Sequence, residues 1–453
     1  MGSPEKINDY SICYDSEELG ERMNQLELSI GVVNFENEYK KLVSPLGSKN
    51  QPFYSWGRYR EAYSGGLVRD LIIKSGIDAS NEFVLDPMCG SGSTLLASAE
   101  MGFDCLGLDV MQYSTLLSKS KFIQLNVDQI KFIHDLLDTH QQFFPEREKV
   151  EPTDGEASLR DYFNEKNFNG VLKIKHLFSN VDDKDVFMLM KTAWLSILEE
   201  CSDKKKDGNG LATQKSRVDD CFSLFRTKLL QMVEDISQRD YPLVDSIVIN
   251  ESAANLSTVV KNVKSQKTLG SVIFSPPYAN SFDYFESYKI ELIMGGWYTL
   301  ETLPEGRKRA IRSYRKGYRN GLLSSDNELI SLLCDEINKR RLDKEKETEK
   351  KDNRSRLVPN LIVGYFSDME DVLREIHRVL PVGKSCYIVV DQSSYLGSIV
   401  PTDILLAHIA LNIGFVVEPI IYCRNSNTSP QQTKKFPYLK NMLRESIVHI
   451  KRM

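Results

Sequence analysis

The chain has 453 residues, of which 41% are hydrophobic, so it can bury a large core and exceeds the length that one domain usually takes. Its net charge of −5 means that a polyanionic partner must be met by a local basic patch rather than by the field of the whole surface. Eight scattered cysteines without a Cys-x-x-Cys pair, and only six histidines, disfavour a disulfide framework and predict no metal site. The sequence has no run of about 18 apolar residues and no apolar signal core, which predicts a soluble, cytoplasmic protein without a membrane partner.

Short β-rich runs recur along the chain, and helical patterns separate most of them. The runs predict seven strands, at 83–85, 105–108, 246–249, 272–274, 386–390, 415–421 and 446–450. Because these runs are almost continuously apolar, we expect them to be buried on both faces of a mostly parallel sheet. Crossover helices are predicted at 93–101, 368–380 and 402–412. Only the polar stretch 424–444 joins the last two strands, so the last strand can run antiparallel in a doubly wound α/β fold.

Two long segments interrupt this alternation of strands and helices. One has a helical pattern and the other is rich in charges. We therefore divide the chain into an N-terminal extension (1–49), three parts of a core (50–111, 244–291 and 358–453), a helical insertion that can serve in recognition or dimerisation (112–243), and a charged insertion that can meet a polyanion (292–357).

A glycine-rich turn follows the first strand of the predicted core. Asp86 ends the strand, and Gly90 and Gly92 let the backbone approach a ligand before a helix begins near Ser93. Asp109, at the end of the next strand, can accept hydrogen bonds from both hydroxyls of a ribose. No Gly-Lys-Ser/Thr follows, so this is not a phosphate loop of the Walker type. The alternative interpretation is an ordinary turn between a strand and a helix.

In its spacing and its Asp-Pro start, this turn resembles the S-adenosylmethionine loop of class I amino-methyltransferases. The segment 54–66 is similar to the one that closes over the methionine end of the cofactor in that family. The resemblance implies S-adenosylmethionine as cofactor and the following contacts to it: Ser64, Asp86, Pro87, Met88, Cys89, Gly90, Ser91, Gly92, Thr94, Asp109 and Val110.

The tetrapeptide Ser275-Pro276-Pro277-Tyr278 directly follows the predicted strand at 272–274. The exocyclic amine of a nucleobase is a poor nucleophile because its lone pair is delocalised into the ring. Ser275 Oγ and the Pro276 carbonyl can each accept an amine hydrogen, and the two prolines stiffen the backbone that carries this acceptor. Tyr278 can stack on a base flipped out of a duplex, and the methyl transfer would be in line and without a covalent intermediate. Alone, such a tetrapeptide is also typical of a turn or a proline-rich ligand.

Both motifs together resemble the DNA amino-methyltransferases of the cytosine-N4/adenine-N6 group, in which Ser-Pro-Pro-Tyr is usual in the cytosine branch. The similarity extends to 368–383, 390–403 and 444–451, while Glu251-Ser252-Ala253 stands where relatives often have Gly-Asp-Ala. It implies a class I methyltransferase fold, double-stranded DNA as substrate, and a place in restriction–modification with a cognate endonuclease as candidate partner.

A basic stretch lies soon after the tetrapeptide. The stretch has seven cationic residues interleaved with Tyr314 and Tyr318, and it contains no acidic residue. Such a composition is typical of a surface that neutralises phosphates. The predicted DNA contacts are Arg307, Lys308, Arg309, Arg312, Arg315, Lys316 and Arg319. The alternative is a solvated charged loop.

The leading prediction is therefore a site-specific DNA methyltransferase that makes N4-methylcytosine. Three alternatives stay open at this point: methylation of adenine N6 in DNA, methylation of RNA, and an inactive DNA-binding subunit that has kept the fold. The sequence does not determine the recognised DNA sequence or the oligomeric state.

Overall fold

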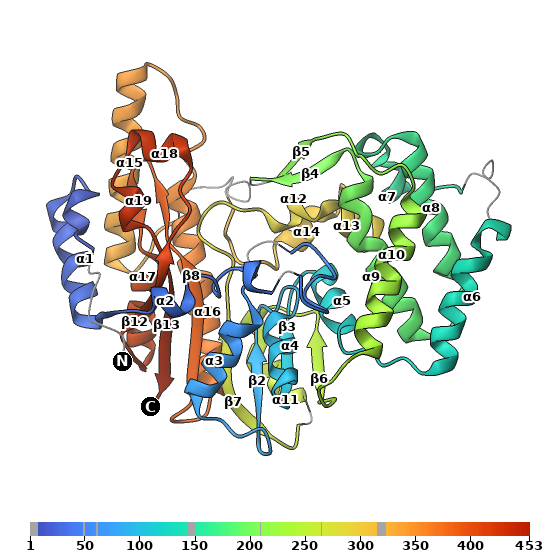
Figure 1. Cartoon of the computed structure of the whole chain (residues 1–453). Coiled ribbons are helices and arrows are strands. Elements are labelled where there is room, and N and C mark those ends of the chain that lie inside the picture. Colours follow the sequence, from blue (N-terminus) through green and yellow to red (C-terminus); the bar gives the residue numbers. More distant parts are fainter. Residues whose placement is uncertain are drawn as a thin grey trace.

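A computed structural model of the chain describes residues 8–48, 50–59, 62–143, 150–208, 210–263, 265–314 and 323–453. Its centre is a nine-stranded sheet in the order β1-β12-β13-β8-β7-β2-β3-β6, with β11 also paired to β13 (Figure 1). In that order the main path comprises Val32–Asn34, Ile420–Asn425, Arg444–Arg452, Ser385–Asp391, Thr268–Phe274, Glu82–Asp86, Asp104–Leu108 and Ser246–Ile249; β11 is Phe415–Val417. The pairs are parallel except those of β13, which runs antiparallel to β8, β11 and β12.

The predicted α/β fold with an antiparallel last strand is thus confirmed, and the sheet differs from the prediction in two details. The predicted strand 415–421 is divided into β11 and β12, because Pro419 between them has no N–H for the ladder with β13. The N-terminal extension also adds β1 as an edge strand beside β12.

Side chains alternate between two hydrophobic cores on the opposite faces of the sheet. Val84 and Ile273 face a core formed with α3 (Gly65–Ser75) and α4 (Ser93–Glu100). Their neighbours along β2 and β7, such as Leu85 and Val272, face a larger core. That core is formed with α1 (Glu17–Ile30), α11 (Leu256–Asn262), α15 (Glu328–Thr348), α16 (Val358–Val379) and α17 (Thr402–Ile413). Helices on both faces make the sheet doubly wound.

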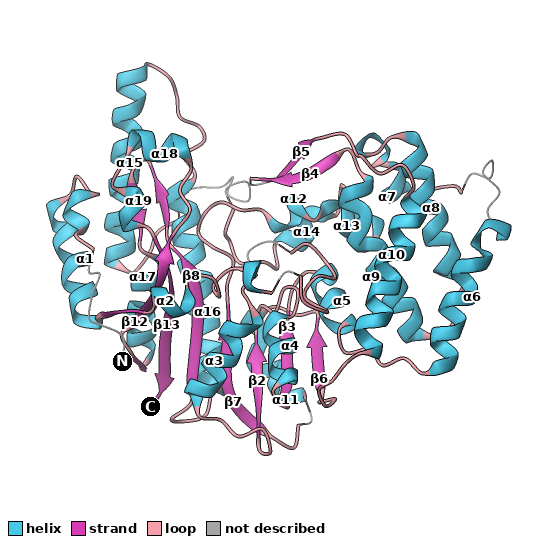
Figure 2. Cartoon of the chain, viewed as in Figure 1, coloured by secondary structure: helices cyan, strands magenta, loops and turns pink. Residues whose placement is uncertain are grey.

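The helical insertion forms a separate lobe with its own core beside the β6 edge of the sheet (Figures 1 and 2). In α9, buried side chains from Val186 to Ile197 recur at helical spacing, and Trp194 Nε1 donates a hydrogen bond of 2.9 Å to the Val171 carbonyl. The elements of this region are α5 (Gln112–Ser120), α6 (Val127–Phe143), α7 (Asp154–Ala157), η3 (Arg160–Tyr162), α8 (Glu165–Ser179), α9 (Lys184–Cys201), β4 (Lys204–Asp207), β5 (Gly210–Thr213) and α10 (Cys221–Ser237). Helices α12 (Tyr284–Ser287), α13 (Lys289–Met294) and α14 (Leu303–Arg307) pack against this lobe.

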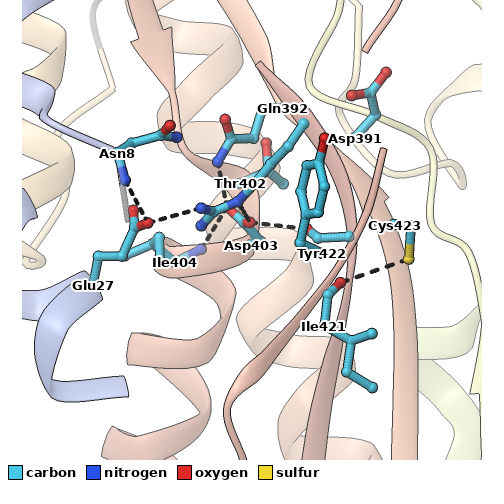
Figure 3. A network of polar contacts seen from close by, with 12 residues as sticks. Asn8, Glu27, Asp391, Gln392, Thr402, Asp403, Ile404, Ile421, Tyr422 and Cys423 are labelled. Carbon is cyan, nitrogen blue, oxygen red and sulfur yellow. Dashed lines mark hydrogen bonds and ion pairs between the residues drawn. The ribbon is translucent and has the colours of Figure 1, made fainter. Parts of the chain in front are cut away.

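A buried ionic network joins the first and last parts of the chain (Figure 3). Arg444 of β13 pairs with Glu27 of α1 at 2.8 Å and with Asp403 of α17 at 2.7 Å, and all three residues are buried. Glu27 also accepts a hydrogen bond from the backbone of Asn8. The N-terminal extension is therefore packed onto the catalytic core by charge as well as by β1.

Short elements complete the chain. They are η1 (Tyr10–Ile12), α2 (Glu36–Tyr39), η2 (Pro45–Gly47), η4 (Ala253–Asn255), β9 (Ser393–Tyr395), β10 (Ser398–Val400), α18 (Pro430–Lys435) and α19 (Leu439–Met442). Among the described residues, no helix combines the length and the apolar character needed to cross a bilayer.

Candidate active site

A cleft lies at the carboxyl ends of β2, β3, β6 and β7 and encloses about 850 Å³, including its open mouth. Its wall contains Asp86 from the end of β2, Asp109 after β3, and Ser275 after β7. Carboxyl ends of parallel strands meet at one edge of a sheet, which is why residues nearly 190 positions apart in the sequence share one site.

The glycine-rich turn has a backbone that other residues would strain. Gly90 and Gly92 have φ angles of 51° and 80°, in the left-handed region. A Cβ on Gly90 would lie 2.9 Å from the Tyr59 ring, and one on Gly92 would lie 2.7 Å from Ser118 Oγ. Both glycines are therefore required by conformation and by close packing.

Asp109 fixes this turn from the neighbouring strand. Its Oδ2 accepts a hydrogen bond of 3.0 Å from the Gly90 N–H, and its Oδ1 accepts one of 2.8 Å from the Met111 N–H. Burial raises the pKa of Asp109 to about 6. The carboxylate oxygens keep further lone pairs, so they can still accept hydrogen bonds from a ligand in the cleft.

Asp86 is the second buried acid of the site. Its Oδ1 accepts a hydrogen bond of 3.0 Å from the Met88 N–H, and the Tyr63 hydroxyl donates to Oδ2 at 3.4 Å. Burial raises the pKa of Asp86 to about 7. A cationic ligand would favour the ionised form of both acids, so the cleft suits a positively charged small molecule.

The other predicted cofactor contacts divide into two groups. Pro87, Met88, Cys89, Ser91 and Val110 also line the cleft, whereas Ser64, Gly92 and Thr94 are not part of its wall.

Two of these side chains have structural partners. The Ser64 hydroxyl caps α3 by accepting a hydrogen bond from the Gly66 N–H at 3.2 Å. Burial raises the pKa of the Cys89 thiol well above its ordinary value, so it stays protonated and is unsuited to act as a nucleophile.

The tetrapeptide reaches the cleft through Ser275 and Pro277. Ser275 Oγ lies 2.9 Å from the Val389 carbonyl of β8, to which it donates its proton. Ser275 Oγ also lies 3.3 Å from the Tyr278 hydroxyl, and the lone pair that neither contact uses can accept a hydrogen bond from a ligand. Pro276 and Tyr278 are buried and do not line the cleft, so stacking of a base on Tyr278 stays a prediction.

Two hydroxyls hold the backbone directly after the tetrapeptide. The Ala279 carbonyl accepts hydrogen bonds from Ser393 Oγ at 2.8 Å and from the Tyr395 hydroxyl at 2.7 Å, both from β9. These two hydrogen bonds attach the loop after Ser275 to the segment that follows β8.

Several residues of the cleft wall were not predicted from the sequence. Tyr59 packs on the turn and stacks on Tyr288 with ring centroids 5.1 Å apart, and Phe285 also lies in the wall. Tyr284 lies in the wall too; the sequence indicates Tyr284 and Phe282 as residues that could shape a base pocket, and Phe282 is not part of the wall. Tyr59 lies within the segment before the cofactor loop, which was the only available signal for it.

The basic stretch is placed differently from the prediction of an open phosphate-binding surface. Arg307 pairs with Asp283 and Glu286, and Arg312 makes a two-nitrogen contact with Asp368 whose shortest distance is 2.6 Å. These acids come from other parts of the chain, which the local pattern could not reveal.

The remaining cations of the stretch fall into three positions. Lys308 is exposed and pairs with Glu305. Arg309 is part of the cleft wall. Arg315, Lys316 and Arg319 lie outside the described residues. Contact of this stretch with DNA stays a prediction.

Comparison with known proteins adds a second line of evidence. The type II methyltransferase M.BsoBI of Geobacillus stearothermophilus is 26% identical over an alignment that covers 97% of this chain and 94% of the relative. The type II methyltransferase M.AvaI of Nostoc sp. is 26% identical over 85% of this chain and 84% of its own length. The chain is thus similar to type II DNA methyltransferases over most of its length.

Two further comparisons add no evidence on function. No protein-family model matches the chain. The solved structure of the rRNA methyltransferase AviRa from Streptomyces viridochromogenes covers 86% of this chain and 85% of its own, with 8% identity and a TM-score of 0.28, which is too loose a superposition for argument.

S-adenosylmethionine is the methyl donor of this class of methyltransferase. The cleft fits this cofactor. Burial raises the pKa of Asp86 and Asp109 and so disfavours their ionised forms, and the sulfonium and ammonium charges of the cofactor would stabilise those forms. In the described ranges, no three His, Cys, Asp or Glu side chains gather as a metal site. The cleft thus has an acid after each of the first two core strands, Asp86 at the end of β2 and Asp109 after β3.

Proposed function

We propose that this DNA methyltransferase transfers a methyl group to the exocyclic N4 amino group of cytosine, as the modification enzyme of a type II restriction–modification system. The observation that carries the proposal is the single cleft shared by Ser275, Asp86 and Asp109. Relatives that are type II methyltransferases and align with almost the whole chain support the biological setting.

The bound cofactor would supply an electrophilic methyl group: as the N–C bond forms, the C–S bond breaks, the sulfur leaves as a neutral thioether, and the methylated amine releases one proton to solvent. Ser275 Oγ and the Pro276 carbonyl would each accept one hydrogen of the target amine, which favours a tetrahedral nitrogen with a localised lone pair. The carbonyl of Val389 holds the Ser275 hydroxyl in this orientation. Positioning is then the main source of rate, since the nitrogen and the methyl carbon are held in line.

The target base must leave the duplex to reach this depth, because Ser275 lies inside a cleft and not on an open surface. We propose that the helical lobe formed by 112–243 and the charged insertion hold the DNA around that base. Within the basic stretch, Arg315, Lys316 and Arg319 are the proposed phosphate contacts, because Arg307 and Arg312 already have carboxylate partners.

The experiment is to methylate plasmid DNA with the purified protein, digest it and resolve the nucleosides by mass. We expect N4-methylcytosine, with S-adenosylhomocysteine formed in equal amount. N6-methyladenine would instead assign the adenine alternative, since serine and aspartate at the first position of the tetrapeptide can both accept an amine hydrogen. Methylation of RNA in place of DNA, or no product despite cofactor binding, would contradict the proposal.

Phosphate binding is tested separately by the salt dependence of DNA binding. Replacing Arg315, Lys316 and Arg319 by Gln should reduce the slope of log K against log salt by about one for each phosphate that is no longer neutralised. The same replacement of Lys40, an exposed cation at the end of α2 that pairs with Glu36 and is not among the predicted DNA contacts, is a control with at most a small expected change. An unchanged slope in the triple variant would remove the assignment.

A further inference from the structure

We propose that Arg309 closes the adenosine end of the cofactor cleft, so that a residue of the charged insertion binds the purine of the methyl donor rather than DNA. The inference rests on the proposed cofactor site. Arg309, Ala310 and Ile311 line the cleft, as do Glu251, Ser252 and Ala253 after β6, and Arg309 contacts Glu251 directly. Residues 309–311 of the charged insertion (292–357) thus lie beside the loop after β6, at the edge of the sheet.

The order of the strands gives the direction of the cofactor in the cleft. Along β7-β2-β3-β6, the wall presents Ser275, Asp86, Asp109 and Glu251 in turn. The methyl group must lie near Ser275, where the amine is proposed to be held. A ribose bound to Asp109 then places the base toward β6, where Arg309 is found.

Hydrogen bonds hold the Arg309 guanidinium at that place. Its Nη1 donates to Asn250 Oδ1 at 3.3 Å, and its Nη2 donates to the Asn250 carbonyl at 3.2 Å. The same Nη2 lies 3.4 Å from Glu251 Oε1. These contacts fix the group to the loop after β6, while 38% of the side chain remains exposed.

The same loop is connected to the acid that is proposed to bind the ribose. Asn250 Nδ2 donates a hydrogen bond of 2.9 Å to the Asp109 carbonyl, and the Asp109 carboxylate holds the Gly90 N–H. Arg309, Asn250, Asp109 and Gly90 therefore form a continuous series of contacts from the charged insertion to the glycine turn. A cofactor that packs against Arg309 would bind to a wall that is already aligned with the turn.

The chemistry of the guanidinium fits a purine. It is planar, weakly hydrated and always charged, and it stacks on aromatic faces, whereas the ammonium of lysine does so less well. Its contacts to Asn250 and Glu251 use in-plane N–H groups, which leaves the flat faces of the group for stacking. The proposed ligand is thus the adenine ring shared by S-adenosylmethionine and S-adenosylhomocysteine.

The test is calorimetric titration of the full chain, without DNA, with S-adenosylmethionine and S-adenosylhomocysteine. We expect Arg309→Ala to weaken both ligands about tenfold, because they share the adenosine. Arg309→Lys should weaken them several-fold through loss of the planar group, and it serves as a second variant if Arg309→Ala does not fold. Lys308→Ala, which removes the adjacent exposed cation, should bind both ligands like the wild type.

Wild-type affinity in both Arg309 variants would overturn the inference and leave the proposed function intact. DNA binding of Arg309→Ala is measured separately at several salt concentrations. A lower DNA affinity and a smaller salt slope, with cofactor affinity unaffected, would also overturn the inference by returning Arg309 to the DNA surface. No heat of binding in the wild type would instead contradict the proposed function itself.

Discussion

The carboxylate of Asp109 accepts a hydrogen bond from the Gly90 N–H at 3.0 Å, so the acid after β3 supports the glycine turn that follows β2. We therefore propose two roles for Asp109 in cofactor binding, one through the ribose and one through the shape of the turn. We predict that Asp109→Ala weakens S-adenosylmethionine by about 2 kcal/mol, the usual effect of losing hydrogen bonds to a charged group. Calorimetric titration measures this change.

Asp109→Asn is the matched variant for separating the two roles. Its amide oxygen can still accept from Gly90 while the charge is lost, so its affinity should lie between those of the wild type and Asp109→Ala. Single-turnover rates at saturating cofactor should change little in either variant. A normal dissociation constant with a slow methyl-transfer step would speak against both roles.

The two buried acids predict that cofactor affinity depends on pH. Burial raises the pKa of Asp86 to about 7 and of Asp109 to about 6, so near neutral pH the free protein holds a proton on part of these groups. A cationic cofactor favours the ionised forms and lowers both pKa values, so binding releases protons. Affinity should therefore fall as the pH is lowered from 8 to 6.

Titrations in buffers of different ionisation enthalpy measure the protons released. At pH 7, Asp86 should contribute about half a proton, and Asp86→Asn should lose that part. The difference between wild type and variant removes the titration of the cofactor's own amino group. Proton uptake assigned to Asp86, or an identical pH profile in Asp86→Asn, would disprove the explanation.

Ser275 is predicted to act on the rate and not on cofactor binding. Ser275→Ala should lower the single-turnover rate by about a hundredfold, as expected when one positioned hydrogen-bonding group is removed from a reacting centre. Ser271→Ala is a suitable control, because Ser271 Oγ donates to the Ser385 carbonyl at 3.2 Å in the same pair of strands but lies outside the cleft wall. Equal rates in the two variants would exclude amine activation by Ser275.

Local sequence patterns predicted those parts of the site that come directly after one strand in the chain. The glycine turn and the tetrapeptide both come after short buried strands, and parallel strands bring their carboxyl ends to one edge. The fold class could be predicted for the same reason, since the periodicity of each strand depends only on its own residues.

Contacts between distant segments could not be predicted in this way. The charges of Arg309 and Arg312 were evident, but their acceptors lie 58 and 56 positions away, at Glu251 and Asp368. A cation that pairs with an acid from another element has part of its charge neutralised, so a basic run in the sequence overstates the net charge of the surface that it forms. The hydroxyls that hold Ala279 are similarly distant, 114 and 116 positions along the chain.

Tyr395 and Ser393 are predicted to position the catalytic loop through the Ala279 carbonyl. Tyr395→Phe removes one of two hydrogen bonds and should lower kcat several-fold with KM for the cofactor unchanged, while the double variant with Ser393→Ala should lower it further. Tyr438→Phe is the control, because its hydroxyl donates to the Gly397 carbonyl at 2.9 Å beyond β9. Equal kcat in Tyr395→Phe and Tyr438→Phe would show that the hydrogen bonds to the Ala279 carbonyl have only a structural role.

The buried pair of Glu27 and Arg444 predicts that α1 is needed for the stability of the core. Glu27→Ala removes one counter-ion from the Arg444 guanidinium, which is buried and also pairs with Asp403. Breaking a buried ion pair from one side typically costs about 3 to 5 kcal/mol, because the remaining charge has given up its water and then its counter-ion. Glu18→Ala breaks an exposed pair with Arg22 on the same helix and should cost less than about 1 kcal/mol. Urea unfolding of the two variants compares these effects in one element, and a midpoint for Glu27→Ala no lower than that for Glu18→Ala would mean that the pair contributes little. A large difference would instead show that the N-terminal extension, which adds β1 to the sheet, is held in place by its charge as well as by its strand.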